Sequence, residues 1–92
     1  MSGFKVELVG KMPPYYDIAE FLWGKSVDID SDGNSEHSRS VDWNELTIIL
    51  RSDESQRVDI DPAEDGFLYI GSEDKKLLAR VVSYLQIYGA IK

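Results

Sequence analysis

The chain has no cysteine, and its longest apolar run is far shorter than a bilayer span. The absence of cysteine excludes a disulfide framework, a thiolate metal cluster and a cysteine nucleophile, and it suits a reducing compartment. The first ten residues, MSGFKVELVG, contain no apolar stretch of signal-peptide length. We therefore expect a soluble, cytoplasmic protein with no membrane-spanning segment.

Catalytic signatures are lacking as well. The only histidine, His37, follows Glu36 in a serine-rich stretch. A general base needs a nucleophile or a substrate proton within reach and an orienting partner, and no nucleophile elbow or oxyanion glycine run accompanies this histidine. Paired carboxylates need a cleft to hold a sugar, and a domain of 92 residues is small for one. The sequence predicts a protein that is not an enzyme and binds no cofactor.

Positive charge is scarce, because 10 lysines and arginines stand against 17 acids, for a net charge of −7. The acids concentrate between residues 28 and 65, where 12 acids and 3 arginines give 3 − 12 = −9. Such a chain repels nucleic-acid phosphate and anionic lipid. We therefore expect no direct nucleic-acid binding, no membrane binding and a basic protein partner.

The length and the apolar content of 42% predict one domain over residues 1–92. Residues that alternate between apolar and polar predict strands, and apolar stripes with a period of 3.6 predict helices. Because so amphipathic a helix has to lie on the sheet, we expect a single-domain α+β two-layer sandwich with a mainly antiparallel sheet of about four strands. The predicted strands are 4–9, 45–51, 56–61 and 67–70, and the two helices on one face are 14–24 and 73–88.

Three details of this architecture are also predicted or left open. Ser72 is the expected N-cap of the second helix, with acids in the first turn. The polar segment 25–42 is expected to be a mobile loop or a hairpin, in which SVDID has the alternation of a marginal strand. The strand order stays open, because the first strand can pair either with the central strand 45–51 or with FLYIG.

The stretch DIDSDG, residues 28–33, resembles the first half of an EF-hand calcium loop. Position 12 of that loop, which supplies a bidentate glutamate, is occupied by Arg39. A plain polar turn is therefore favoured over a metal site. The calcium ligands of the alternative reading are Asp28, Asp30, Asp32, Asn34 and Glu36.

The remaining signal is an acidic surface on the predicted strands and the loop before them. Alternation places Asp59 and Asp61 on the same outward side of their strand. Like charges on one face repel, and a basic partner would offset that cost. Tryptophan is a frequent interface anchor, and Trp43 stands beside the acidic loop, although it can equally belong to the core. The predicted partner-binding residues are Asp28, Asp30, Asp32, Glu36, Asp42, Trp43, Glu45, Asp59 and Asp61.

In general character, a small, acidic, cysteine-free α+β domain without a catalytic set resembles bacterial immunity proteins and other stoichiometric inhibitors. That resemblance implies a non-enzymatic protein-binding domain that masks a basic toxin or nuclease. Two alternatives stay open: a calcium-binding module through residues 28–39, and a small accessory subunit or homodimer without a ligand.

Overall fold

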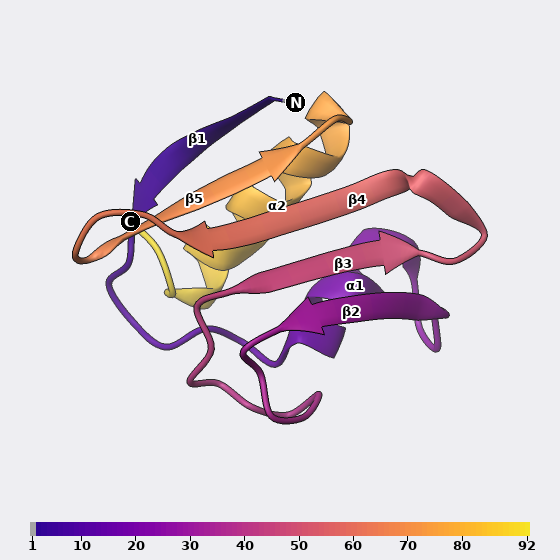
Figure 1. Ribbon diagram of the computed structural model, residues 1–92, viewed down its shortest axis with the longest axis horizontal. Helices are drawn as coiled ribbons and strands as arrows, with labels where there is room; N and C mark the ends of the chain where they lie inside the picture. Colours follow the sequence, from indigo (N-terminus) through magenta and orange to yellow (C-terminus); the bar gives the residue numbers. More distant parts are fainter. Residues whose placement is uncertain (1) are drawn as a thin grey trace.

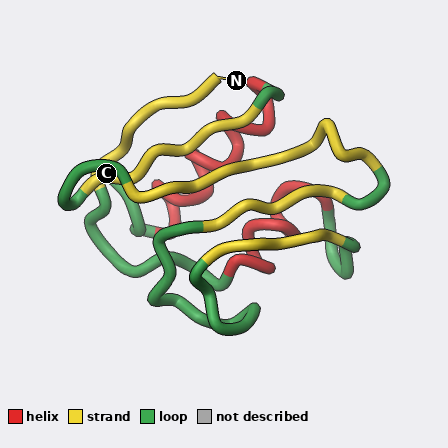
Figure 2. The backbone as a smooth tube through the Cα atoms, viewed as in Figure 1, coloured by secondary structure: helices red, strands yellow, loops and turns green. Residues whose placement is uncertain are grey.

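The computed structural model describes residues 2–92 as two layers, a sheet and a pair of helices. Figures 1 and 2 show both helices on the same side of the sheet. The α+β sandwich is therefore confirmed, with five strands where the sequence predicted about four. The elements in chain order are β1 (Ser2–Glu7), α1 (Tyr15–Trp23), β2 (Ile29–Gly33), β3 (Leu46–Leu50), β4 (Asp53–Pro62), β5 (Phe67–Ser72) and α2 (Lys75–Tyr88).

The sheet is antiparallel throughout, with the strand order β1-β5-β4-β3-β2. The segment containing α1 carries the chain from β1, at one edge, to β2, at the other (Figure 1). The strands β2 to β5 then form a meander that returns to β1. This arrangement settles the open question of strand order, because β1 pairs with β5 and not with the central strand β3.

The core lies between the sheet and the helices. Alternate residues of the strands point into it, among them Leu46, Ile48, Ile60 and Ile70, all at most 1% exposed. Since successive side chains of a strand point to opposite faces, the intervening residues lie on the face that no helix covers. We call this face the open face.

The helices form where the apolar stripes predicted them. In α2 the stripe of leucines and valines is buried, and Gly89 ends the helix with φ +95°. Arg80 of α2 donates hydrogen bonds to the carbonyl oxygens of Phe21 and Leu22, at 2.8 and 3.1 Å, which satisfies the last turn of α1. No helix within residues 2–92 has the length and apolar character to cross a membrane.

The N-cap of α2 differs from the prediction. Ser72 is the last residue of β5, and Asp74 caps the helix by accepting hydrogen bonds from the N–H groups of Lys76 and Leu77. The hydroxyl of Ser72 donates instead to the carbonyl oxygen of Arg57 and accepts from the N–H of Asp74. Serine and aspartate are both favourable N-cap residues. Because β5 extends through Ser72, the helix begins only after Asp74, and Asp74 is the cap.

The segment 25–42 is a hairpin arm followed by a closed loop. Of the marginal strand expected in SVDID, only Ile29 and Asp30 belong to β2, which runs on to Gly33 and supplies the fifth strand. The loop after it is closed at its base by Asn34, whose side-chain oxygen accepts from the N–H groups of Asn44 and Glu45, both at 3.0 Å. Trp43 anchors this loop to the core, where it is 2% exposed and its indole N–H donates to the carbonyl oxygen of Pro13.

We predict that the charge of Asp74 stabilises the fold. The pKa of Asp74 is lowered, first by a hydrogen bond from Gln56 and then by the N–H of Leu77. A carboxylate with a lowered folded-state pKa contributes stability above its unfolded pKa and loses it as the pH falls through the folded value. Asn is also a good N-cap, so Asp74→Asn isolates the charge.

The expected result is a lower urea midpoint for Asp74→Asn than for the unchanged protein at pH 7, with a difference that shrinks as the pH falls below the usual range of Asp, about 3.9. Glu73→Gln serves as the control, because Glu73 precedes the cap, and it should show less of this pH dependence. An Asp74→Asn difference that persists unchanged in acid would show that the carboxylate acts by shape alone.

Candidate functional site

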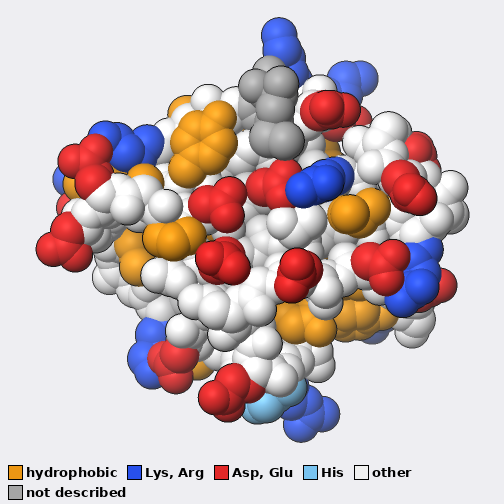
Figure 3. All heavy atoms as spheres, in the orientation of Figure 1, with side chains coloured by type: hydrophobic (Ala, Val, Ile, Leu, Met, Phe, Trp, Pro, Cys, Tyr) orange, Lys and Arg blue, Asp and Glu red, His pale blue; other side chains and the backbone are white. Residues whose placement is uncertain are grey.

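The open face carries most of the charged residues that the strands contribute. Figure 3 looks onto this face and shows acidic side chains gathered across its middle. The register places them in neighbouring rows, since Asp59 lies opposite Thr47 and Thr47 opposite Asp32. The side chains of the open face include Lys5 and Glu7 of β1, Asp30 and Asp32 of β2, Glu45 just before β3, Thr47 and Ile49 of β3, Arg57, Asp59 and Asp61 of β4, and Phe67 and Tyr69 of β5.

Asp59 is the central carboxylate of this face, and its charge is neutralised within the protein. It is 7% exposed and accepts hydrogen bonds from the Thr47 hydroxyl at 2.6 Å and from the Arg57 guanidinium at 3.1 Å. These interactions raise the pKa of Arg57 above its usual value, first through the hydrogen bond and then through the attraction between the charges. The prediction placed Asp59 on the outward side correctly, but a buried and paired carboxylate has little charge to offer a partner.

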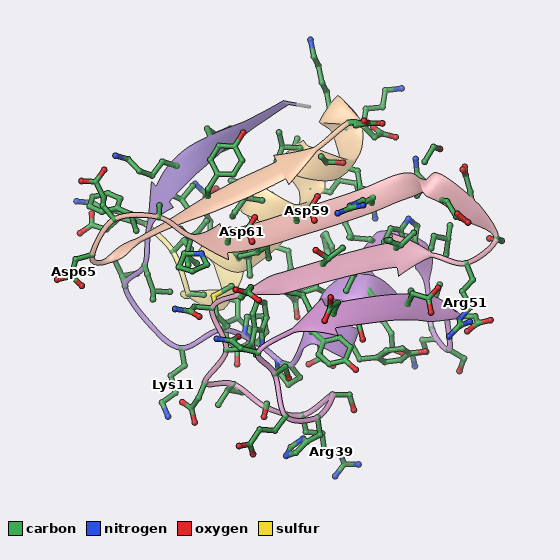
Figure 4. The ribbon with its side chains drawn as sticks, viewed as in Figure 1. Lys11, Arg39, Arg51, Asp59, Asp61 and Asp65 are labelled. Carbon is green, nitrogen blue, oxygen red and sulfur yellow. The ribbon has the colours of Figure 1, made fainter. Side chains whose placement is uncertain are left out.

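Other acids of the open face carry their charge into solvent. Figure 4 shows Asp61 on the same strand and the same side as Asp59. Asp32, Glu45 and Asp61 are exposed, and none of them forms an ion pair with another residue among 2–92. The three come from β2, from the residue before β3 and from β4, so they span three adjacent strands. We call Asp32, Glu45 and Asp61 the acidic strip.

The strip ends beside an exposed aromatic ring. Tyr69 lies opposite Asp61 in the β4–β5 register and is 39% exposed. Its ring covers Gly3 of the edge strand β1, where an added Cβ would lie 2.5 Å from the tyrosine hydroxyl oxygen. An aromatic ring over a glycine in the neighbouring strand stabilises the pairing of the two strands. Tyrosine next to charge is also a common anchor of protein interfaces.

The residues of the partial calcium motif lie along an extended strand. Asp30 and Asp32 belong to β2, and Asp28 and Asp30 both pair with Arg51, at 3.0 and 2.8 Å. An EF-hand loop must wrap its oxygens around one ion, which an extended strand cannot do. No group of three acids or histidines within residues 2–92 is close enough to hold a metal ion. The calcium alternative therefore has no geometric support here.

The remaining predicted contact residues lie in or near the closed loop. Glu36 belongs to this loop and is exposed, as is Arg39, which Figure 4 labels. Asp42 forms an ion pair with Lys11 at 3.0 Å, at the rim of an open hollow of about 380 Å³. Trp43 belongs to the core, the second of the two readings the sequence left open, so its ring is not a surface anchor.

The predicted partner-binding residues do not include Arg57, Thr47 and Tyr69, which decide how charge and contact area are distributed on this face. The alternation of RVDID and of FLYIG placed Arg57 and Tyr69 on the outward side, and this signal was available. Their partners were not available, because the contact between Thr47 and Asp59 depends on the register of β3 against β4. Only the register shows which acid is neutralised and which is free.

A second exposed surface lies on the helical layer and is aromatic. The rings of Phe21 and Tyr84 are 4.7 Å apart, and those of Tyr84 and Tyr88 are 6.3 Å apart. Ile87, 81% exposed, belongs to the same side of α2. Burial raises the pKa of Tyr84, and the charge of Asp17 adds to this effect. We call Phe21, Tyr84, Ile87 and Tyr88 the helical patch.

Comparison with known proteins gives no relative from which a function can be carried over. No family model matches the chain, and no curated protein or solved structure is significantly similar to it.

We predict that Arg57 stabilises the fold by neutralising Asp59. Arg57→Met keeps the apolar stem but removes the guanidinium, which leaves a nearly buried carboxylate with the Thr47 hydroxyl as its remaining side-chain partner. We expect a loss of about 1–2 kcal/mol in the free energy of unfolding, measured by urea denaturation at neutral pH. Part of this loss should be recovered when Asp59→Asn is added, because the unpaired charge is then gone.

Arg39→Met is the matched control. Arg39 is exposed at the closed loop and forms no ion pair within residues 2–92, so its replacement should change stability by less than about 0.5 kcal/mol. If Arg57→Met proves as neutral as Arg39→Met, the pair with Asp59 contributes nothing to the fold.

Proposed function

We propose that this protein is a non-enzymatic binding domain for a basic protein, and that it acts as a stoichiometric inhibitor such as an immunity protein that masks a toxin or nuclease. The acidic strip and Tyr69 form the contact surface. The single observation that carries the proposal is the exposure of Asp32, Glu45 and Asp61 together on a sheet face that no helix covers.

The physical argument starts from the cost of this arrangement. Like charges on neighbouring strands repel, and the domain already has a net charge of −7. Within the protein, Arg57 neutralises Asp59 and Arg51 pairs with Asp30, but the acidic strip is left without such partners among residues 2–92. Lysines or arginines of a partner would supply the missing charges.

The same charges would also favour the encounter. A surface of one sign attracts an oppositely charged protein over distances of about 10 Å at moderate ionic strength, which raises the association rate and makes it sensitive to salt. The open face is built from the strands and is supported by the core behind it, so the strip is held in one geometry before binding. Preorganisation of this kind lowers the entropic cost of association.

The alternative of an accessory subunit or homodimer rests on the other side of the molecule. The helical patch exposes aromatic and aliphatic groups, of which Ile87 is the most accessible. Exposed apolar groups of this size are frequent in contacts between subunits. Association through the helical patch would leave the acidic strip free, and this difference allows the two functions to be separated.

We predict that reversing two charges of the acidic strip abolishes binding to the basic partner. The protein, its Glu45→Lys/Asp61→Lys variant and a control are each immobilised, and basic proteins retained from an extract of the native host are quantified by mass spectrometry at low and at physiological salt. The unchanged protein should enrich a particular basic protein. The variant should retain at least tenfold less of it, which corresponds to a loss of about 1.4 kcal/mol in binding free energy.

The control is Glu54→Lys/Asp65→Lys. Glu54 is exposed near the start of β4, at the opposite end of that strand from Asp61, and Asp65 lies in the turn between β4 and β5, away from the strip (Figure 4). Both variants exchange two acids for two lysines and so raise the net charge by four, from −7 to −3. Equal loss in both would mean that net charge alone is responsible. Full retention by Glu45→Lys/Asp61→Lys would contradict the proposal and leave the helical patch as the contact surface.

A further inference from the structure

The two edges of the sheet are not equally open. At the β1 edge, the end of the chain runs beside Glu7–Val9. Leu8 forms a bridge with Ile91, and the N–H of Lys92 donates to the carbonyl oxygen of Glu7. At the β2 edge, four of the five residues are exposed, and Figure 1 shows no further strand beside it. Within residues 2–92, the β2 edge is thus free along its whole length, whereas the β1 edge is covered at its Glu7 end.

The register shows which backbone groups of β2 are free. The carbonyl oxygen of Asp28 accepts from Arg51, and the N–H of Asn34 donates to Glu45, so even-numbered residues direct their backbone groups toward β3. In an antiparallel pair the residues between them direct theirs away. The N–H and C=O groups of Ile29, Ser31 and Gly33 therefore point outward along the edge, where an added strand would pair with them.

The two sides of this edge have different chemistry. On the open face, Asp30, which pairs with Arg51 at 2.8 Å, and Asp32, which forms no ion pair within residues 2–92, alternate with the outward-pointing backbone groups. Beside Ser31 and Gly33 lies a small hollow of about 160 Å³, whose lining also includes Tyr15, Ser35 and His37 and the two acids Asp32 and Glu36. An added strand would thus place alternate side chains beside two carboxylates and the intervening ones over or beside the hollow.

We infer that the β2 edge binds an extended segment of the basic partner as a sixth strand, with lysine or arginine at alternate positions facing Asp30 and Asp32. This inference rests on the proposed function and names the mode of binding. Main-chain hydrogen bonds to Ile29, Ser31 and Gly33 supply affinity, and the two carboxylates select the charge of the segment. The hollow receives one side chain of the segment.

The same carboxylates exclude a second copy of this chain. In a two-fold antiparallel pair of β2 strands centred on Ser31, Asp30 of each copy would lie directly opposite Asp32 of the other. Like charges directly opposite each other destabilise strand pairing. Charged residues on an exposed edge strand commonly prevent self-association in this way. The charge that repels a copy attracts a basic strand.

The test uses three synthetic heptapeptides and the intact protein. The first peptide alternates threonine and lysine. The second has the same sequence but carries a backbone N-methyl group on every residue whose N–H would donate a hydrogen bond to β2. The third has glutamate in place of every lysine. Amide hydrogen exchange is followed by NMR. The outward N–H groups of Ile29, Ser31 and Gly33 report edge pairing, and those of Asp30 and Asp32, which already point to β3, are the internal control.

We expect the lysine peptide, at about ten times its dissociation constant, to slow exchange at the outward amides about tenfold, and the other two peptides to leave it unchanged. In Asp32→Lys the affinity for the lysine peptide should fall about threefold to fivefold. Slowed exchange with the glutamate peptide, or no slowing with the lysine peptide, overturns the inference. If the lysine peptide and its N-methylated form both perturb Glu45 and Asp61 without protecting the edge, strand addition is wrong but the proposed function stands.

Discussion

The placement of both helices on one face of the sheet is the constraint on which the rest of this structure depends. Within residues 2–92, α1 and α2 are the only helices that can cover the apolar side chains of the sheet, and both lie on the same side of it (Figure 1). One face then holds the core and the other meets water. Every strand has to be apolar on one side and polar on the other, and most acids of the strands fall on the polar side.

A network of hydrogen bonds at the N-terminal end of α2 shows how the two layers are held together. Trp23 of α1 donates to Gln56 of β4, and Gln56 donates to Asp74, the cap of α2. One chain of hydrogen bonds thus joins both helices to the sheet. Arg80 adds a second connection, from α2 to the end of α1. These contacts fix the helical layer, and with it the support of the open face.

The charges of the open face fall into two groups with different roles. Asp59 is part of the structure, since its carboxylate is buried against Thr47 and Arg57. The acidic strip is exposed and has no such partner within residues 2–92. An acidic composition is explained by solubility as readily as by binding of a partner. Binding of a partner is favoured here because Asp59 is neutralised within the protein, while the acidic strip on the same face is exposed.

The sequence by itself determined the class of the fold, the positions of both helices, the strands β3 and β5 to within a residue or two, and the outward side of Asp59 and Asp61, because these depend on periodicity within short segments. It placed a marginal strand at SVDID, residues 26–30, of which only Ile29 and Asp30 belong to β2, because a strand of five residues with three polar side chains carries little signal.

Only the tertiary structure decided which acids are free. The neutralisation of Asp59 depends on the pairing of β3 with β4, and the choice of Asp74 over Ser72 as the cap depends on how far β5 extends against its neighbours. The burial of Trp43 depends on the docking of the closed loop against Pro13. Each of these contacts joins residues far apart in the chain, and no local pattern records them, since periodicity reports the face of a residue but not its partner.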